Sequence, residues 1–321
     1  MLKIKNKSIF IIVILLITFF LFFKFMKKEN EKYIKSNDIQ IYTEAFGEQQ
    51  KPTVLLISGA MAPARFWTDE FCKQISDAGY FVIHYDHRDM GLSTSIDYEK
   101  NPYTLNDLEK DAIAILDAYK IKKAHFVGHS MGGMLVQLLA LNYPERCLSI
   151  TSISDGLLSN ISLSKKDKEI LDRTWKILLE NKPTMNFEES LPGFLKSYKY
   201  LNGTVTFDQK MAEEYIKDMY QQSKHMFKTK DGQIKSFQIP HNHVKAQENI
   251  KVTKEDLQKI TTPTLIIHGQ EDYIMLPINA QQTAQAIPNS KLKIIPGMGH
   301  MIFNHDLENE IAKLIIQFIS K

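Results

Sequence analysis

The sequence predicts an α/β protein, namely a mostly parallel, doubly wound sheet with an inserted helical cap. Short β-rich runs alternate with helical segments along most of the 321 residues, which is the pattern of a parallel sheet flanked by helices. Several of these runs are continuously apolar, as strands buried on both faces are expected to be. Residues 157–260 interrupt the alternation and contain no convincing buried strand.

The predicted strands begin at residues 39–45, where apolar and polar side chains alternate, after a polar linker near residues 27–37. Six shorter apolar runs then predict buried strands of one open sheet: 54–57, 80–85, 124–127, 149–153, 264–267 and 292–295. The clearest helix is expected at residues 105–119, where Thr104 and Asp107 make a start that resembles a capping box.

These segments predict a division of the chain into four parts. Residues 1–30 are expected to form a membrane anchor and linker, 31–156 and 261–321 the two parts of the core, and 157–260 a cap. The cap segment is rich in Lys, Glu, Met and aromatic residues and is predicted to be mainly helical. Most of its methionines and aromatic rings are expected to pack against the core, and some to contact a substrate.

The composition is that of a globular chain, with 44% hydrophobic and 24% charged residues. The formal charge is +3, but the first thirty residues hold six lysines and one glutamate, so the remainder is slightly acidic. A slightly acidic globular part argues against nucleic-acid binding. Cys72 and Cys147 lie in unrelated contexts, which favours two buried free thiols; a single disulfide stays open.

The N-terminal segment is apolar from Ile9 to Phe23 except at Thr18. No Ala-x-Ala-like cleavage site follows, which favours an uncleaved signal anchor over a cleaved signal peptide. Lysines flank the run on both sides and nearly balance. We therefore expect a single-pass membrane protein with its catalytic domain outside the cytoplasm.

Residues 128–132, Gly-His-Ser-Met-Gly, match the Gly-x-Ser-x-Gly pattern of a nucleophile elbow. A strand is predicted directly before the pattern and a helix directly after it, which is the context that the pattern requires. In such a sharp turn the flanking glycines relieve crowding, and the serine hydroxyl is exposed above the sheet. Ser130 is therefore the predicted nucleophile.

A serine nucleophile needs a base and an acid that orients the base. His300 follows the last predicted strand, and Asp272 follows the strand before it. The chain order Ser130, Asp272, His300 is the order that this arrangement requires. Asp155, after an earlier strand, is the alternative acid.

The tetrahedral oxyanion of acyl transfer needs backbone N–H donors. One is expected from Met131, the residue after the nucleophile, and one from the loop that follows residues 54–57. In that loop Ala60 is the predicted donor, and Met61 is the alternative if the register differs by one residue.

Residues from about 40 to the C-terminus resemble the α/β-hydrolase superfamily. Residues 85–93, Tyr-Asp-His-Arg-Asp-Met-Gly-Leu-Ser, resemble its Asp-x-Arg-x-x-Gly-x-Ser loop and are similar to the subgroup that contains aclacinomycin methylesterase. The resemblance implies the α/β-hydrolase fold and a cofactor-free carboxylic ester hydrolase with a helical cap over its pocket. Asp86, His87 and Arg88 are then expected to make structural hydrogen bonds. His129 and the N-terminal anchor depart from the subgroup, so its polyketide substrates are not carried over.

The predicted function is a serine hydrolase that cleaves a carboxylic ester through an acyl-enzyme, without metal or cofactor. Its predicted partners are a small-molecule or lipid-like acyl ester and the membrane. Lipase, thioesterase, aminopeptidase or perhydrolase chemistry on the same triad stays open, because the fold does not separate them. A ligand-binding protein that retains the fold without catalysis is the alternative of another class.

Overall fold

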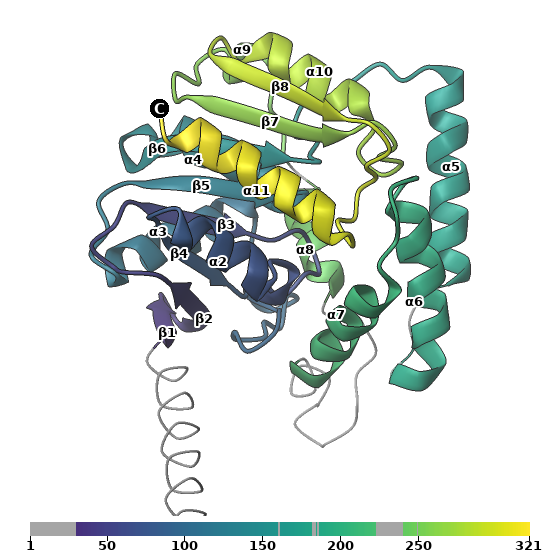
Figure 1. Cartoon of the computed structure of the whole chain (residues 1–321), viewed down its shortest axis with the longest axis horizontal. Coiled ribbons are helices and arrows are strands. Elements are labelled where there is room, and N and C mark those ends of the chain that lie inside the picture. Colours follow the sequence, from purple (N-terminus) through teal and green to yellow (C-terminus); the bar gives the residue numbers. More distant parts are fainter. Residues whose placement is uncertain (1–29, 160, 182–183, 185, 223–239, 249) are drawn as a thin grey trace, which may run out of the picture.

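The computed structural model describes residues 30–321 except 160, 182–183, 185, 223–239 and 249. One eight-stranded sheet in the order β1-β2-β4-β3-β5-β6-β7-β8 forms its centre (Figure 1). β1 pairs antiparallel with β2, β2 pairs antiparallel with β4, and the other neighbours are parallel. The strands are β1 (Glu31–Ser36), β2 (Ile39–Phe46), β3 (Thr53–Ile57), β4 (Phe81–Tyr85), β5 (Ala124–His129), β6 (Cys147–Ile153), β7 (Thr264–Gly269) and β8 (Ser290–Ile295).

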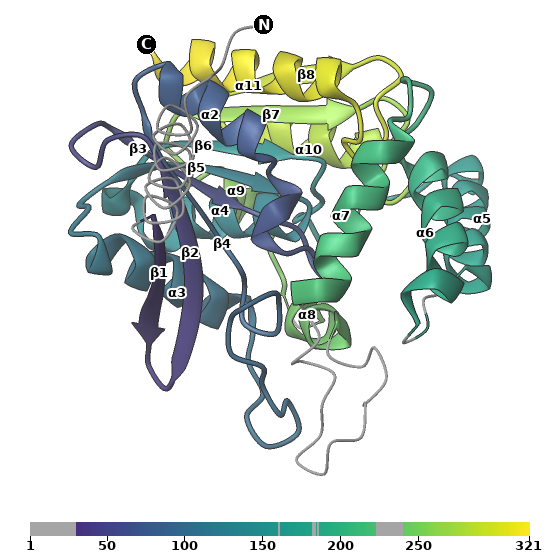
Figure 2. The ribbon, with the colours of Figure 1, turned by 60° about the horizontal axis from the view of Figure 1, so that its bottom comes forward.

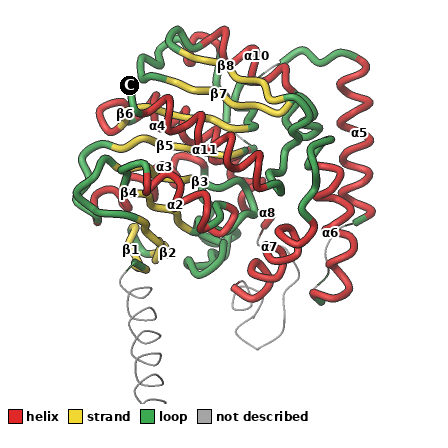
Figure 3. Tube along the Cα trace, viewed as in Figure 1, coloured by secondary structure: helices red, strands yellow, loops and turns green. Residues whose placement is uncertain are grey.

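Helices cover both faces of the sheet (Figure 3), so the predicted doubly wound, mostly parallel sheet is confirmed. α2 (Asp69–Asp77) and α11 (His305–Ile319) pack on one face, and α3 (Leu105–Ala118), α4 (Met131–Asn142) and α10 (Pro277–Ala286) on the other. Successive strand side chains point to opposite faces. Accordingly Leu55 and Ile57 belong to one buried cluster, and Val54 and Leu56 to the other.

β1 overturns part of the predicted linker. Residues 31–36 form an edge strand that pairs with β2 over its whole length. Its side chains alternate, with Ile34 and Ser36 buried and Lys32 and Lys35 exposed. The strand was missed because only one of its large apolar side chains, Ile34, is buried, while its lysines are typical of edges that must not pair further.

The inserted helical cap is confirmed. Between β6 and β7 the described residues form α5 (Lys165–Glu180), α6 (Phe187–Leu201), α7 (Gln209–Gln222), α8 (Pro240–Gln247) and α9 (Lys254–Leu257). Figure 2 shows α5 to α8 beyond the carboxyl ends of the parallel strands. α9 packs on α4 and α10 of the core instead, and the exact domain boundaries remain predictions.

The predicted membrane anchor lies within residues 1–29, outside the described residues. Among the residues that the structure describes, no helix is both long and apolar enough to cross a membrane. Cys72 and Cys147 are both buried and unpaired, so the prediction of two free thiols is confirmed.

Candidate active site

Ser130 stands at the sharp turn from β5 into α4. Its φ of 54° and ψ of −119° lie where non-glycine residues are rare, and its N–H donates to Ile153 O at 2.8 Å. The flanking glycines make the turn possible. A Cβ on Gly132 would lie 2.2 Å from Ile57 O, and a Cβ on Gly128 would lie 2.0 Å from Gly132 O. The local backbone therefore exposes the serine at the carboxyl edge of the sheet, as such an elbow does.

The structure brings Ser130, His300 and Asp272 together from three different loops. Ser130 Oγ lies 3.1 Å from His300 Nε2, and His300 Nδ1 lies 2.8 Å from Asp272 Oδ2. The other carboxylate oxygen, Oδ1, accepts from the N–H groups of Ile274 at 3.0 Å and Met275 at 2.8 Å. The carboxylate is thus fixed on both oxygens, and the histidine can present an unprotonated Nε2 to the serine hydroxyl.

The electrostatics of Asp272 keep it ionised. Burial raises the pKa of this carboxyl, but the adjacent His300 and the hydrogen bonds outweigh burial and hold the pKa below its usual value. An ionised Asp272 at Nδ1 favours the imidazolium that forms when His300 takes a proton.

Asp155, the alternative acid, lies elsewhere. It is fully buried beneath α4. Its carboxylate accepts one hydrogen bond from Ser152 Oγ at 2.5 Å and another from the side-chain amide of Gln137. Burial raises its pKa. Because Asp155 makes no hydrogen bond to His300 within the described part of the chain, the geometry favours Asp272 as the partner of the histidine.

The loop after β3, residues 58–62, is here called the oxyanion loop. It touches the nucleophile, since a Cβ on Gly59 would lie 3.1 Å from Ser130 Cβ. Met61 N–H already donates to His243 Nδ1 at 3.1 Å, whereas no acceptor of Ala60 N–H is found among the described residues. Met131 begins α4, so its N–H has no acceptor within the helix. Ala60 and Met131 are therefore the better placed pair of donors.

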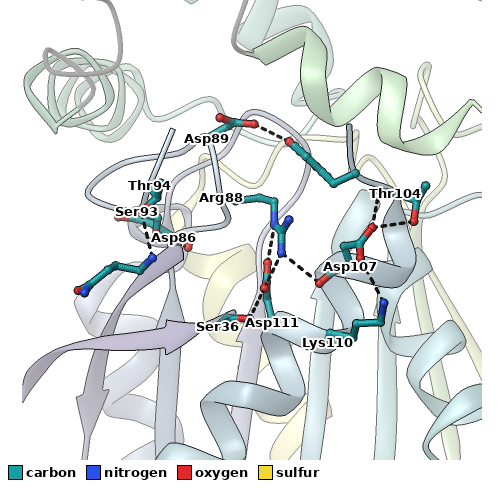
Figure 4. A network of polar contacts seen from close by, with 12 residues as sticks. Ser36, Asp86, Arg88, Asp89, Ser93, Thr94, Thr104, Asp107, Lys110 and Asp111 are labelled. Carbon is teal, nitrogen blue, oxygen red and sulfur yellow. Dashed lines mark hydrogen bonds and ion pairs between the residues drawn. The ribbon is translucent and has the colours of Figure 1, made fainter. Parts of the chain in front are cut away.

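The loop that carries the family resemblance, residues 86–94, is a network of structural hydrogen bonds (Figure 4). Asp86 accepts from Ala64 N at 2.7 Å and Leu92 N at 2.8 Å. Arg88 donates to both carboxylate oxygens of Asp111, each at 2.7 Å. His87 donates to the carbonyl of Ser58 at 3.0 Å. The structural role expected for Asp86, His87 and Arg88 is thus seen in their contacts.

A cavity of about 520 Å³ lies between the cap and the core and reaches Ser130 and His300. Its walls are mostly apolar and aromatic, including Phe66, Phe194, Leu201, Tyr198, Tyr215 and Met219. Asp89 is the one charged side chain among the described lining residues other than histidine. The carboxylate oxygens of Asp89 accept hydrogen bonds from the Tyr103 hydroxyl at 2.7 Å, the Asn242 amide at 3.0 Å and the N–H of Ile96 at 2.5 Å. The part of the wall that the structure describes thus offers mainly apolar contact and neither Lys nor Arg.

Two histidines near the site have contacts that the sequence did not reveal. His129 Nε2 donates to His300 O at 2.8 Å, and its ring stacks on Phe66 with centroids 4.5 Å apart. His243, on α8, contacts the oxyanion loop. His243 lies in a polar stretch of the cap without periodic pattern, so only the tertiary fold brings it there. The described residues contain no group of three His, Cys, Asp or Glu side chains arranged to hold a metal ion.

Comparison with known proteins gives a consistent assignment. The family described as alpha/beta hydrolase fold matches residues 52–305. The chain is 32% identical over 288 residues to rhodomycin D methylesterase DauP of Streptomyces sp. strain C5, covering 84% of this chain and 92% of that protein. It is 26% identical over 281 residues to the proline iminopeptidase of Lactobacillus helveticus, covering 86% and 92%.

Solved structures agree on the fold. The 2-hydroxy-6-oxo-6-phenylhexa-2,4-dienoate hydrolase of Rhodococcus sp. strain RHA1 superposes with a TM-score of 0.70 at 16% identity, covering 91% of this chain and 98% of that chain. The family match over most of the chain and a relative above 30% identity agree with the eight-stranded sheet and its elbow. The chain belongs to the alpha/beta hydrolase fold family.

Proposed function

We propose that this protein is a serine hydrolase that cleaves carboxylic esters through an acyl-enzyme on Ser130. The observation that carries the proposal is the continuous chain of hydrogen bonds from Asp272 through His300 to Ser130, beside a largely apolar cavity. A serine hydroxyl becomes nucleophilic only when a base takes its proton. The methylesterase named among its relatives supports an ester as the substrate class.

In the acylation step, Ser130 Oγ attacks the ester carbonyl carbon while its proton passes to His300 Nε2. Asp272 holds the imidazole in orientation and stabilises the imidazolium. The N–H groups of Ala60 and Met131 donate to the oxyanion of the tetrahedral intermediate. The bond to the alcohol oxygen then breaks, and the alcohol leaves with the proton from His300.

Deacylation uses the same groups in reverse. A water molecule gives a proton to His300 Nε2 as its oxygen attacks the acyl carbon. The second tetrahedral intermediate collapses by breaking the bond to Ser130 Oγ, which regains the proton from His300. The carboxylic acid is released and the free enzyme is restored.

The walls of the cavity indicate a neutral, largely apolar ester. A buried carboxylate on the substrate needs a partner of opposite charge, and neither Lys nor Arg occurs among the described lining residues. The uncharged polar side chains of Asn181, Ser197 and Gln247 also line the cavity. A neutral ester with a large apolar part therefore suits this wall.

The proposal is tested by covalent labelling and kinetics. A fluorophosphonate probe should label the wild-type protein and fail to label Ser130→Ala, and kcat on a 4-nitrophenyl ester should fall by roughly 10⁴–10⁶ in the variant. Ser76→Ala, on α2 with its hydroxyl bonded to Lys73 O, is the matched control and should label normally. Near wild-type esterase activity in Ser130→Ala would show that the nucleophile is another group.

A panel of acyl substrates separates esterase chemistry from its neighbours. Esters, thioesters and aminoacyl amides of one acyl group should be cleaved in that order of preference if the ester is the natural substrate class. A folded wild-type protein that neither labels nor hydrolyses any member of the panel would favour a ligand-binding role.

The location is also a proposal. The apolar run at residues 9–23 supports attachment to a membrane, and we propose that the catalytic part lies outside the cytoplasm. Cell fractionation with protease treatment of intact cells tests it: recovery in the soluble fraction contradicts attachment, and full protection from protease contradicts the orientation.

A further inference from the structure

His243 connects the cap to the oxyanion loop. It lies on α8, is fully buried, and uses both ring nitrogens on backbone groups of the core. Nδ1 accepts from Met61 N–H at 3.1 Å, and Nε2 lies 2.8 Å from the carbonyl oxygen of Arg88. One side chain of the cap therefore spans two loops of the core.

The two backbone partners fix the protonation of this ring. The amide of Met61 can only donate and the carbonyl of Arg88 can only accept. His243 is therefore the neutral tautomer with its proton on Nε2. Burial lowers its pKa, which agrees with a neutral ring, and its neighbours His87 and Tyr103 pack edge-on against it with centroids 5.6 and 6.4 Å away.

The oxyanion loop needs such external support. Met61 has a φ of 62°, in the left-handed region that is costly for a side-chain-bearing residue. At the start of the loop His87 holds the carbonyl of Ser58, whose own hydroxyl donates to Ala62 O at 3.0 Å. His243 supplies the contact at Met61, directly after Ala60.

Arg88, whose carbonyl oxygen accepts the hydrogen bond from His243 Nε2, is itself held by other contacts. Its guanidinium donates twice to the buried carboxylate of Asp111, and Ser36 Oγ donates to the same carboxylate at 2.6 Å. Figure 4 shows Arg88 directed at Asp111. The ring of His243 is thus fixed on its Nε2 side by a rigid loop, so its Nδ1 side can fix Met61.

We propose that His243 is a positioning residue for ester hydrolysis. By holding the Ala60–Met61 peptide it fixes the backbone on the C-terminal side of Ala60, and so keeps the adjoining Ala60 N–H directed at the oxyanion. By engaging Met61 N–H, it also leaves Ala60 and Met131 as the two donors of the hole. The inference rests on the proposed function. It assigns part of the oxyanion hole to the cap.

Substitutions of His243 test this assignment. His243→Leu removes both hydrogen bonds, and its kcat should fall by roughly 10–100-fold with KM changed less than about threefold, because a misaligned oxyanion donor affects mainly the transition state. The Oδ1 atom of His243→Asn can stand near the position of Nδ1 and accept from Met61 N–H. This variant should recover kcat to within about fivefold of wild type.

A third variant keeps the test sharp if His243→Leu does not fold. The amide of His243→Gln reaches towards the position of Nε2, so it can bond Arg88 O while leaving Met61 N–H without a partner. Its kcat should therefore be reduced as in His243→Leu, and should be lower than that of His243→Asn. Equal kcat values for the Asn and Gln variants would contradict the proposal.

Two further readouts separate positioning from a general structural role. A trifluoromethyl ketone forms a hemiketal oxyanion with the serine, so its inhibition constant should weaken in His243→Leu by the same factor as kcat/KM. Hydrogen exchange at the Met61 amide should be faster in the Leu variant and protected in the Asn variant. His125→Leu is the control, since His125 bonds Ser149 Oγ at 2.8 Å at the far end of β5; it should lower stability without lowering kcat.

The outcomes distinguish this inference from the proposed function. If the wild type hydrolyses esters and His243→Leu retains kcat within twofold, His243 does not position the hole. A loss of kcat with an unchanged inhibition constant for the trifluoromethyl ketone also contradicts the proposal, because it shows only a structural role for His243. If the wild type hydrolyses no ester, the proposed function fails, and unchanged exchange at Met61 in His243→Leu then overturns the placement of His243 by itself.

Discussion

His300 donates through Nδ1 to Oδ2 of Asp272 over 2.8 Å. The other oxygen of Asp272 is fixed by the N–H groups of Ile274 and Met275, so the carboxylate cannot turn away from the ring. Asp155 is the only other acid proposed for this role, and its hydrogen bonds run to Ser152 and to Gln137. The two acids are thus distinguishable by substitution.

Asp272→Asn should lower kcat by about 10⁴, because an amide can favour the wrong tautomer of His300 and cannot stabilise an imidazolium. Asp155→Asn should lower thermal stability through its buried contacts and change kcat by less than about tenfold. Steady-state kinetics on one ester, with melting curves for both variants, measure the difference. The reverse order of kcat losses would assign the acid to Asp155.

The fold was predictable because its central strands are buried on both faces. Runs such as residues 54–57 and 264–267 are continuously apolar, and both are parallel strands of the sheet. The positions of Asp272 and His300 followed from the same pattern, since loops at the carboxyl ends of parallel strands share one edge. The chain order and the elbow then singled out three side chains, which lie within hydrogen-bonding distance in series.

What the sequence could not predict depends on contacts between distant segments. β1 buries only alternate side chains at the sheet edge, and its exposed lysines made the segment resemble a polar linker. The choice between Ala60 and Met61 was open because the hydrogen bond that engages Met61 N–H comes from His243, which is 182 residues away in the chain. The contents of the cavity wall depend on how α5 to α8 pack. No local periodicity encodes any of these three features.

Glu109 on α3 predicts a pH dependence of stability. Its Oε2 accepts from Asn142 at 2.9 Å, but Oε1 is buried without a partner among the described residues. Burial raises the pKa of this carboxyl to about 7, from 4.5 when exposed. The folded state therefore binds the proton more tightly than the unfolded state. Its contribution is complete below about pH 4.5 and is lost as the pH rises through about 7.

Glu109→Gln should remove this component. Between pH 5 and pH 8 the wild type should lose on the order of 2–3 kcal/mol more free energy of unfolding than the variant does. Urea denaturation at both pH values measures the two differences, and using differences cancels any change in packing caused by the amide. Identical pH dependence in both proteins would mean that Glu109 titrates normally in the folded state.

The walls of the cavity predict discrimination against anionic substrates. 4-Nitrophenyl valerate and the 4-nitrophenyl hemiester of glutarate have acyl chains of similar length, but the second carries a carboxylate. Its kcat/KM should be lower by at least about 100-fold, because a buried, unpaired charge costs several kcal/mol. The neutral amide of the same hemiester is the size-matched control. Its kcat/KM should lie between the values for the valerate ester and the hemiester. Equal rates for valerate and hemiester would indicate a cationic partner in the pocket.

Two apolar side chains at the cavity predict a dependence on the length of the substrate. Trp175 and Leu179 are 54% and 66% exposed, lie one turn apart on α5, and both line the cavity. Single exposed apolar residues are ordinary, but a neighbouring pair beside a pocket indicates a contact surface. A short acyl group ends inside the cavity, whereas a long chain or a large ring system extends to this pair.

Trp175→Ala and Leu179→Ala should therefore raise KM for 4-nitrophenyl decanoate by roughly 3–10-fold each, as expected for about 1 kcal/mol of lost apolar contact. KM for the acetate ester should stay within about twofold, since acetate does not reach α5. Lys176→Ala, an exposed position on the same helix that does not line the cavity, is the control and should change neither value. Equal effects on acetate and decanoate would mean that the substitutions disturb the cap itself, and no effect on either would place the long chain along another wall. Because the triad is untouched in each variant, kcat on acetate reports whether the catalytic groups are intact while KM on decanoate reports the contact.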